Sequence, residues 1–133
     1  MAPSSKLAYL DSSALVKLIA VEPQTAALRA ELIHWRRRAT SLLAVVEVIR
    51  TARRLGPQAT ALAPRVLSGV RLLAIDPIIL AATRIDGPLV RTLDAIHLAT
   101  AAALGYELGA LITYDQQMLT EAQIIRLPVL SPR

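Results

Sequence analysis

The stretch Leu7–Lys17 constrains the fold most strongly, because an apolar run ends there abruptly in a carboxylate. The run Leu7–Leu10 has the composition of a short buried strand, Asp11 follows it directly, and apolar residues then recur at helical spacing. This pattern predicts a strand, a turn that carries Asp11, and a helix that begins near Ser12 or Ser13. Ligands bind at the carboxyl ends of strands in open parallel sheets, so Asp11 is a candidate site residue. Taken alone, it fits a helix N-cap better, a role that Asp often fills.

Strand-like and helix-like segments alternate along the rest of the chain. Short strands are predicted at 39–41, 70–75, 111–114 and 128–130, and helices at 23–35, 42–55, 58–68, 92–103, just after Asp76-Pro77 and after Asp115. Pro64 is expected to break or restart its helix, and Asp86-Gly87-Pro88 is expected to form a loop. The alternation predicts an α/β fold, a three-layer α/β/α sandwich with a mainly parallel central sheet.

Length and composition favour one domain over residues 1–133, with enough residues for a substantial core. No stretch of 18 apolar residues is free of charge and proline, and no signal-peptide core follows the N-terminal residues. We therefore expect a cytoplasmic protein that does not contact a membrane. The chain has no cysteine, which excludes disulfides and thiolate metal sites.

The formal net charge of +5 favours a polyanionic partner such as RNA. Thirteen of the fifteen basic residues are arginine, however, and a GC-rich genome explains this usage equally well. The chain has no Phe, three Tyr and one Trp, too few for a wide platform on which bases stack. RNA binding would therefore depend on arginine side chains and the backbone.

Four carboxylates stand out by their positions. Asp11 and Asp115 each follow an apolar strand, whereas Glu47 and Asp94 lie inside or at the head of otherwise apolar helices. Burial of the Glu47 carboxylate without a partner would cost roughly several kcal/mol. We therefore expect Glu47 to have a partner. If the four acids converge, each pair about 5 Å apart repels by roughly 3 kcal/mol at an effective dielectric constant of ~20. A cation or protonation relieves that repulsion.

A site of oxygen ligands without cysteine favours Mg²⁺, with Mn²⁺ as a substitute, over zinc. Mg²⁺ keeps several waters and uses few carboxylates, which suits a site that receives phosphates. The expected chemistry is the attack of a metal-activated water on a phosphodiester, with stabilisation of the departing oxygen by metal.

Four segments also resemble, in order, the four acidic motifs of PIN-domain ribonucleases. They are 9–18 (YLDSSALVKL), 41–48 (SLLAVVEV), 93–101 (LDAIHLATA) and 111–115 (LITYD). The resemblance runs from about Leu7 to Leu130. Chain length and motif order are similar to those of VapC, the toxin of bacterial VapBC toxin–antitoxin pairs.

The resemblance implies a PIN-like fold and a Mg²⁺-dependent endoribonuclease that cuts structured RNA such as tRNA or ribosomal RNA. It makes Asp11, Glu47, Asp94 and Asp115 the catalytic and metal-site carboxylates, with Asp11 and Asp94 as direct ligands. Ser13 stands where the family usually has Thr or Ser, and its hydroxyl is expected to orient a carboxylate or water. Implied partners are a VapB-type antitoxin and a second copy of the chain in a homodimer.

The roles of several other side chains stay open. His97 shares a helical face with Asp94, and a structural hydrogen bond is favoured over a metal or general-base role. A phosphate contact competes with an ion pair or a solvated surface at Lys17, Arg36, Arg37, Arg38, Arg50 and Arg54. Trp35 fits a core residue and a partner anchor equally.

Two other functions compete with a toxin nuclease. One is a protein whose main act is binding an antitoxin, with co-repression as the output, and the other is a PIN nuclease of RNA maturation without an antitoxin. A phosphoryl-accepting receiver domain also has strand-end Asp residues. It needs an acidic pair after the first strand, where this chain has Leu10-Asp11-Ser12, so that alternative is excluded.

Overall fold

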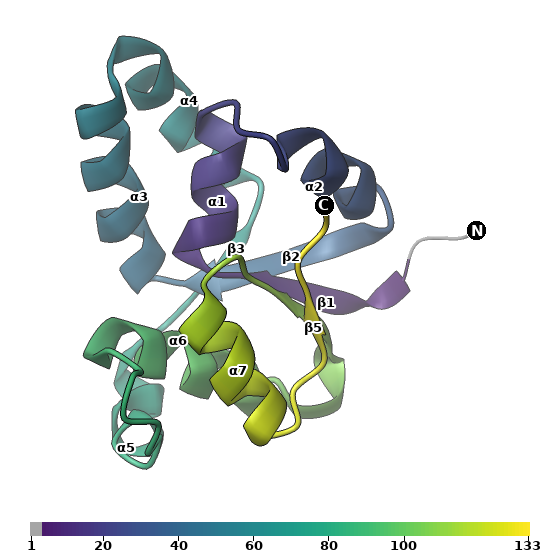
Figure 1. Cartoon of the computed structure of the whole chain (residues 1–133), viewed down its shortest axis with the longest axis vertical. Helices are drawn as coiled ribbons and strands as arrows, with labels where there is room; N and C mark the ends of the chain where they lie inside the picture. Colours follow the sequence, from purple (N-terminus) through teal and green to yellow (C-terminus); the bar gives the residue numbers. More distant parts are fainter. Residues whose placement is uncertain (1–3) are drawn as a thin grey trace.

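Five parallel strands form the centre of the protein in a computed structural model that describes residues 4–133 (Figure 1). They are β1 (Ser4–Leu10), β2 (Trp35–Ser41), β3 (Arg71–Leu73), β4 (Leu108–Ile112) and β5 (Val129–Leu130), in the spatial order β3-β2-β1-β4-β5. The first strand is therefore the middle one, and the strand order reverses beside it. In open α/β sheets this reversal creates a crevice at the carboxyl ends of the strands, here between β1 and β4.

Helices cover both faces of the sheet (Figure 1). One layer holds α1 (Ser12–Ile19), α2 (Thr25–Leu32), α3 (Leu43–Leu55) and α4 (Pro57–Ser68), and the other holds α5 (Ile79–Ala82), α6 (Thr92–Ala103) and α7 (Gln116–Ile124). Two short 3₁₀ helices, η1 (Asp76–Ile78) and η2 (Gly105–Glu107), precede α5 and β4. The predicted three-layer sandwich is confirmed. Among the described residues no helix is long and apolar enough to cross a membrane.

The alternating side chains of β1 supply both halves of the core. Ala8 and Leu10 pack with α1 to α4, whereas Tyr9 packs with α6 and α7. All three are fully buried. Period-2 alternation on a strand that is covered on both faces explains why the run is apolar at nearly every position. It also places the one polar atom of that run, the Tyr9 hydroxyl, on the side of α6.

The second strand begins earlier than the sequence predicts. Trp35, predicted as the last residue of the preceding helix, and the run Arg36–Arg38 after it belong to β2. Pairing with β1 explains the difference, because Arg37 lies opposite Leu7 in the parallel register. On its other side β2 pairs with β3 only from Ala39 onward. The first half of β2 thus has one free edge, which leaves Arg36 and Arg37 exposed to solvent.

Pro64 neither breaks nor restarts α4, and that prediction is wrong. The helix runs unbroken from Pro57 to Ser68. An interior proline costs about 3 kcal/mol. The buried face formed by Ala59, Ala63 and Leu67 offsets this cost by packing in the core.

Gly109 of β4 lies directly beneath the Trp35 indole, so Trp35 is a core-packing residue. A Cβ at position 109 would meet Trp35 Cζ3 at 2.3 Å, and the indole is fixed by its Nε1–H, which donates to Glu31 Oε2 at 2.9 Å. We expect Gly109→Ala to lower the free energy of unfolding by about 1–3 kcal/mol through overpacking, measured by urea denaturation. Gly69→Ala is the control, because its nearest neighbour would be Val66 O at 3.5 Å. Equal stability of the two variants would contradict the prediction.

Candidate active site

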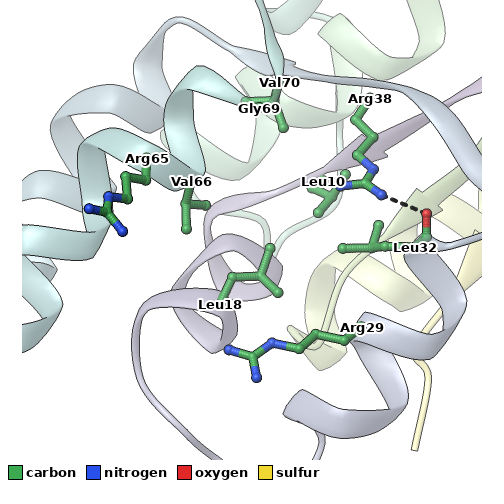
Figure 2. Close-up of a pocket in the computed structure, with 9 residues that line it drawn as sticks. All are labelled: Leu10, Leu18, Arg29, Leu32, Arg38, Arg65, Val66, Gly69 and Val70. Atoms are coloured by element: carbon green, nitrogen blue, oxygen red, sulfur yellow. Dashed lines mark hydrogen bonds between the residues drawn. The ribbon is translucent and has the colours of Figure 1, made fainter.

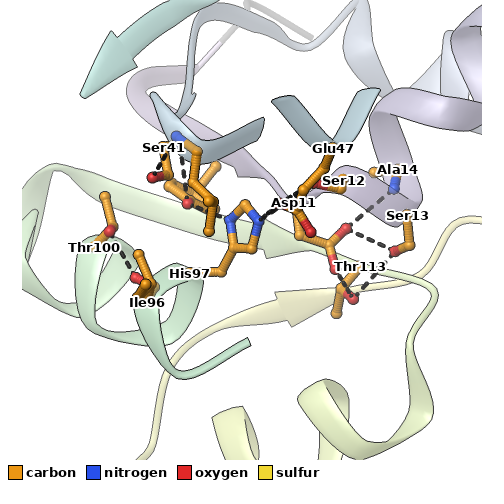
Figure 3. A network of polar contacts seen from close by, with 12 residues as sticks. Asp11, Ser12, Ser13, Ala14, Ser41, Glu47, Ile96, His97, Thr100 and Thr113 are labelled. Atoms are coloured by element: carbon orange, nitrogen blue, oxygen red, sulfur yellow. Dashed lines mark hydrogen bonds and ion pairs between the residues drawn. The ribbon is translucent and has the colours of Figure 1, made fainter. Parts of the chain in front are cut away.

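Asp11 follows the carboxyl end of β1 and caps α1, so the strand-end position and the helix cap considered for it are compatible. Its Oδ1 accepts hydrogen bonds from Ala14 N at 3.0 Å and Ser13 Oγ at 2.7 Å, and its Oδ2 accepts one from Thr113 Oγ1 at 2.6 Å (Figure 3). The residue is only 2% exposed. Ser13 thus orients a carboxylate, as the sequence predicts.

Burial raises the pKa of Asp11 above its ordinary value of 3.8. The nearby His97 and the hydrogen bonds from Ser13, Thr113 and Ala14 lower it, but they do not cancel the effect of burial. The ionised form of Asp11 is therefore less favourable in the folded protein than in water. A cation nearby would reduce that cost.

Glu47 reaches the same region from α3 and has the partners that its position requires. Ser12 Oγ donates to Glu47 Oε1 at 2.6 Å, and His97 Nε2 lies 2.7 Å from the same oxygen (Figure 3). Burial alone would raise the pKa of Glu47, but the contacts with His97 and Ser12 outweigh it and lower the pKa. Glu47 is thus stabilised as an anion.

His97 makes the structural hydrogen bonds favoured from the sequence. It is 1% exposed, and its Nδ1 lies 2.6 Å from the Tyr9 hydroxyl. Burial raises the pKa of that phenol far above its usual value, although the backbone N–H of Ser41 opposes the shift. The sequence analysis did not identify Tyr9 or Ser12 as site residues. The only signal for Tyr9 was a lone polar atom inside an apolar strand.

Asp94 and Asp115 complete the acidic edge. Asp94 lies in the first turn of α6, and Asp115 caps α7 by accepting from Met118 N at 2.9 Å. Burial raises the pKa of Asp94, and the negative charges of Asp115 and Glu47 raise it further. The three carboxylates are therefore close enough to repel one another.

The donor set of this edge fits a hard divalent cation, since it consists of carboxylate oxygens whose mutual repulsion such an ion would relieve. Among residues 4–133, however, no three His, Cys, Asp or Glu side chains form a ready-made metal cage. The carboxylates lie along one edge of the sheet, but their side chains do not converge on a single point.

Of the basic residues considered, Lys17 is already engaged. Its Nζ pairs with Glu22 Oε2 at 2.6 Å, donates to Gln24 at 3.1 Å and lies 4.7 Å from the centre of the Tyr114 ring. Arg50 and Arg54, by contrast, are exposed beside Glu47 in a shallow hollow. Neither pairs with an acid in the described part of the chain, so the intrahelical ion pair considered for them is not formed.

A second hollow lies between α1, α2 and α4, away from the carboxylates (Figure 2). Its floor is apolar, and three arginines border it: Arg29, Arg38 and Arg65. Arg38 is held in place, since its guanidinium donates to Leu32 O at 2.7 Å and Trp35 O at 2.8 Å. Arg29 and Arg65 are exposed and form no ion pair among the described residues.

Comparison with known families places this chain in a defined class. The model of the PIN domain matches residues 8–122, a range that contains all four carboxylates. At the level of whole sequences, the chain is 43% identical over 128 residues to ribonuclease VapC46 of Mycobacterium tuberculosis, an alignment that covers 93% of this chain and 96% of the relative. Ribonucleases VapC35 and VapC47 of the same species are 40% and 39% identical, with the same coverage of both chains. The chain therefore belongs to the PIN-domain family and, within it, to the VapC ribonucleases.

Solved structures agree with this assignment. A toxin–antitoxin complex from Klebsiella pneumoniae contains a chain that is 25% identical, with a TM-score of 0.70 and coverage of 95% of this chain and 98% of that one. FitAcB from Neisseria gonorrhoeae (TM-score 0.72, 19% identity, coverage 94% and 97%) and M. tuberculosis VapC20 (TM-score 0.69, 17% identity, coverage 94% and 99%) share the fold.

Proposed function

We propose that this chain is a Mg²⁺-dependent endoribonuclease that cuts structured RNA such as tRNA or ribosomal RNA, with Asp11, Glu47, Asp94 and Asp115 as its metal-site carboxylates. The observation that carries the proposal is the placement of Asp11 and Asp115 after the neighbouring strands β1 and β4, where burial and the charges of Asp115 and Glu47 raise the pKa of Asp94. Burial of Asp11 at the end of the neighbouring strand adds to the demand for a cation. Mn²⁺ is expected to substitute.

The contacts of each residue define its proposed role. Asp11 and Asp94 would be direct ligands, with Glu47 and Asp115 acting in part through water or a second ion. Ser13 and Thr113 fix both oxygens of Asp11, which keeps that carboxylate in one orientation. A bound Mg²⁺ would supply charge neutralisation and a nucleophilic water for attack on the phosphodiester. Arg50 and Arg54 would contact the RNA backbone.

The first test is cleavage of total bacterial RNA by protein purified free of any partner. We expect discrete fragments with Mg²⁺ or Mn²⁺ and none with a chelator, and the fragment ends would identify the substrate. Fragmentation that continues in the chelator would contradict a metal-dependent mechanism. Intact RNA in every condition would favour the alternative in which antitoxin binding and co-repression are the main role.

We further propose that the chain is the toxin of a VapBC pair and binds an antitoxin in the hollow of Figure 2. A chain that is 25% identical is part of a toxin–antitoxin complex. The apolar floor with exposed Arg29 and Arg65 at its rim suits an amphipathic segment with acidic residues. A PIN nuclease of RNA maturation would lack such a partner, so the presence of a small gene directly upstream separates the two alternatives.

The double variant Arg29→Glu/Arg65→Glu is expected to weaken binding of the upstream-encoded protein about 10–100-fold, because reversed charges would repel acidic residues. Titration calorimetry measures the change. Arg53→Glu is the control, since Arg53 is exposed on α3 outside this hollow. RNA cleavage by the free double variant should stay at the wild-type level. Equal weakening by the control would point to a nonspecific effect of net charge.

The homodimer is also part of the proposal. Exposed apolar side chains gather on α3 and at the head of α6, where Val46 is 57% exposed and Leu93 is 43% exposed. Both line the hollow that also holds Arg50 and Arg54, so a second copy bound there would lie beside the RNA. Exposed apolar surface of this kind often marks an interface. Sedimentation of the purified chain would test it, and a monomer at micromolar concentration would contradict it.

A further inference from the structure

Glu47 is held by only one of its two carboxylate oxygens. Oε1 accepts from Ser12 Oγ and lies within hydrogen-bond distance of His97 Nε2, whereas Oε2 has no hydrogen bond to any of residues 4–133. The Glu47 side chain is 22% exposed and lines two hollows, one on each side of it. One oxygen is therefore fixed by the protein, and the other is left without a protein partner.

The contact with Glu47 determines which nitrogen of His97 carries its proton. An ionised carboxylate has no proton to donate, so a contact of 2.7 Å requires a hydrogen on Nε2. Ser12 Oγ, 3.3 Å from the same nitrogen, already donates its proton to Glu47, so it can only accept from His97. Both neighbours of Nε2 are thus acceptors.

The other side of the ring is held by Tyr9. The Tyr9 hydroxyl oxygen accepts from the backbone N–H of Ser41 at 3.0 Å and lies 2.6 Å from His97 Nδ1. A chain of hydrogen bonds therefore runs from Ser41 through Tyr9 and His97 to Glu47.

We propose that His97, fixed by Tyr9 with a hydrogen on Nε2, is a positioning residue that holds Oε1 of Glu47 and leaves Oε2 free for the cation. This inference rests on the proposed role of Glu47 in the metal site. It gives His97 a role that differs from both metal ligation and core packing. Tyr9, on the central strand, would then act on the metal site indirectly, through its contact with His97.

Burial makes the chain of hydrogen bonds rigid. His97 and Tyr9 are 1% and 0% exposed, and their rings meet edge to face with centroids 5.8 Å apart. Water cannot replace either ring, so loss of the His97 contact leaves Glu47 held only by Ser12 Oγ. Outer hydrogen bonds that orient metal ligands typically change metal affinity about 10–100-fold when they are removed.

The first experiment reads the tautomer directly. Long-range ¹H–¹⁵N NMR of metal-free protein labelled at histidine distinguishes protonated from bare ring nitrogens, and a His34→Gln variant assigns the signals, because the chain has two histidines. We expect a protonated Nε2 at His97. In Tyr9→Phe, which removes the partner of Nδ1, the fraction of His97 protonated at Nε2 should fall. A bare Nε2 in the wild type would overturn the proposal.

The second experiment measures Mn²⁺ affinity by electron paramagnetic resonance of the free ion. His97→Asn should weaken binding about 10–100-fold, because its amide reaches only the place of Nδ1. His97→Gln should restore most of the affinity, because its amide nitrogen can occupy the place of Nε2 and donate to Glu47. His97→Leu is the complete deletion, and should it fail to fold, the Asn and Gln pair carries the comparison. Equal affinity of the Asn and Gln variants would overturn the positioning role.

Glu47→Gln separates this inference from the proposed function. If Glu47→Gln binds Mn²⁺ as tightly as the wild type, the proposed ligand role of Glu47 is wrong, whatever the tautomer of His97. If Glu47→Gln loses affinity while His97→Asn keeps it, the ligand role stands and the positioning role alone fails.

Discussion

Replacement of Asp94 by Asn is expected to reduce RNA cleavage at least about 100-fold, a loss of roughly 3 kcal/mol of transition-state stabilisation. Asn keeps the size of the side chain and removes the charge that would hold a cation at the head of α6. The first turn of that helix should remain intact, because the amide oxygen of Asn can still accept from the backbone N–H of Arg91, the N-cap residue that interacts with Asp94. The measurement is the initial rate of fragment formation from total RNA at saturating Mg²⁺, with the melting temperature as a check of folding.

Glu107→Gln is the matched control for this experiment. Glu107 lies in η2 just before β4, at the end of the sheet opposite the acidic edge. Its side chain is exposed and makes a 3.6 Å ion pair with Arg37, a contact worth about 0–1 kcal/mol. We expect wild-type cleavage from this variant. If both variants cut RNA at the wild-type rate, the carboxylate mechanism is wrong.

The strands and the acids could be predicted because each leaves a local signal. Asp11 and Asp115 stand directly after apolar runs, and a parallel sheet brings the ends of such runs to one edge. Glu47 is a lone charge in an apolar helix, which already implies a partner. These inferences need only the period of the pattern and the cost of a buried charge.

The contacts between elements left no such signal. The partnership of Tyr9, His97 and Glu47 joins residues from three elements, and only their placement in three dimensions reveals it. The early start of β2 at Trp35 depends on pairing with β1, and the charge run Arg36–Arg38 by itself does not indicate a strand. Pro64 remains helical because of tertiary packing, which overrides a local preference.

The unfavourable ionisation of Asp11 should lower the stability of the metal-free protein at neutral pH. Because burial raises its pKa, the folded state binds more protons than the unfolded state above its ordinary value of 3.8. The stability that Asp11 contributes is therefore present at low pH and lost as the pH rises through the raised pKa. Asp11→Asn cannot ionise, so its melting temperature should exceed that of the wild type at neutral pH, with a difference that grows as the pH rises from about 4.

Glu47 provides the opposite control, because its pKa is lowered by His97 and Ser12 against the effect of burial. Its contribution is present above its ordinary value of 4.5 and lost as the pH falls through the lowered pKa. Glu47→Gln should therefore melt below the wild type at neutral pH, although it removes one negative charge just as Asp11→Asn does. If Asp11→Asn and Glu47→Gln both melted above the wild type, the cause would be a general effect of net charge.

Addition of Mg²⁺ should reverse the order of wild type and Asp11→Asn. At one hundred times its dissociation constant, a ligand that binds only the folded state stabilises it by about 2.7 kcal/mol. For a domain of this size that corresponds to roughly 10 °C in melting temperature. Thermal denaturation with and without Mg²⁺ measures both effects, and we expect a large upward shift for the wild type and little for Asp11→Asn. Equal shifts for the two proteins would place the bound cation away from Asp11.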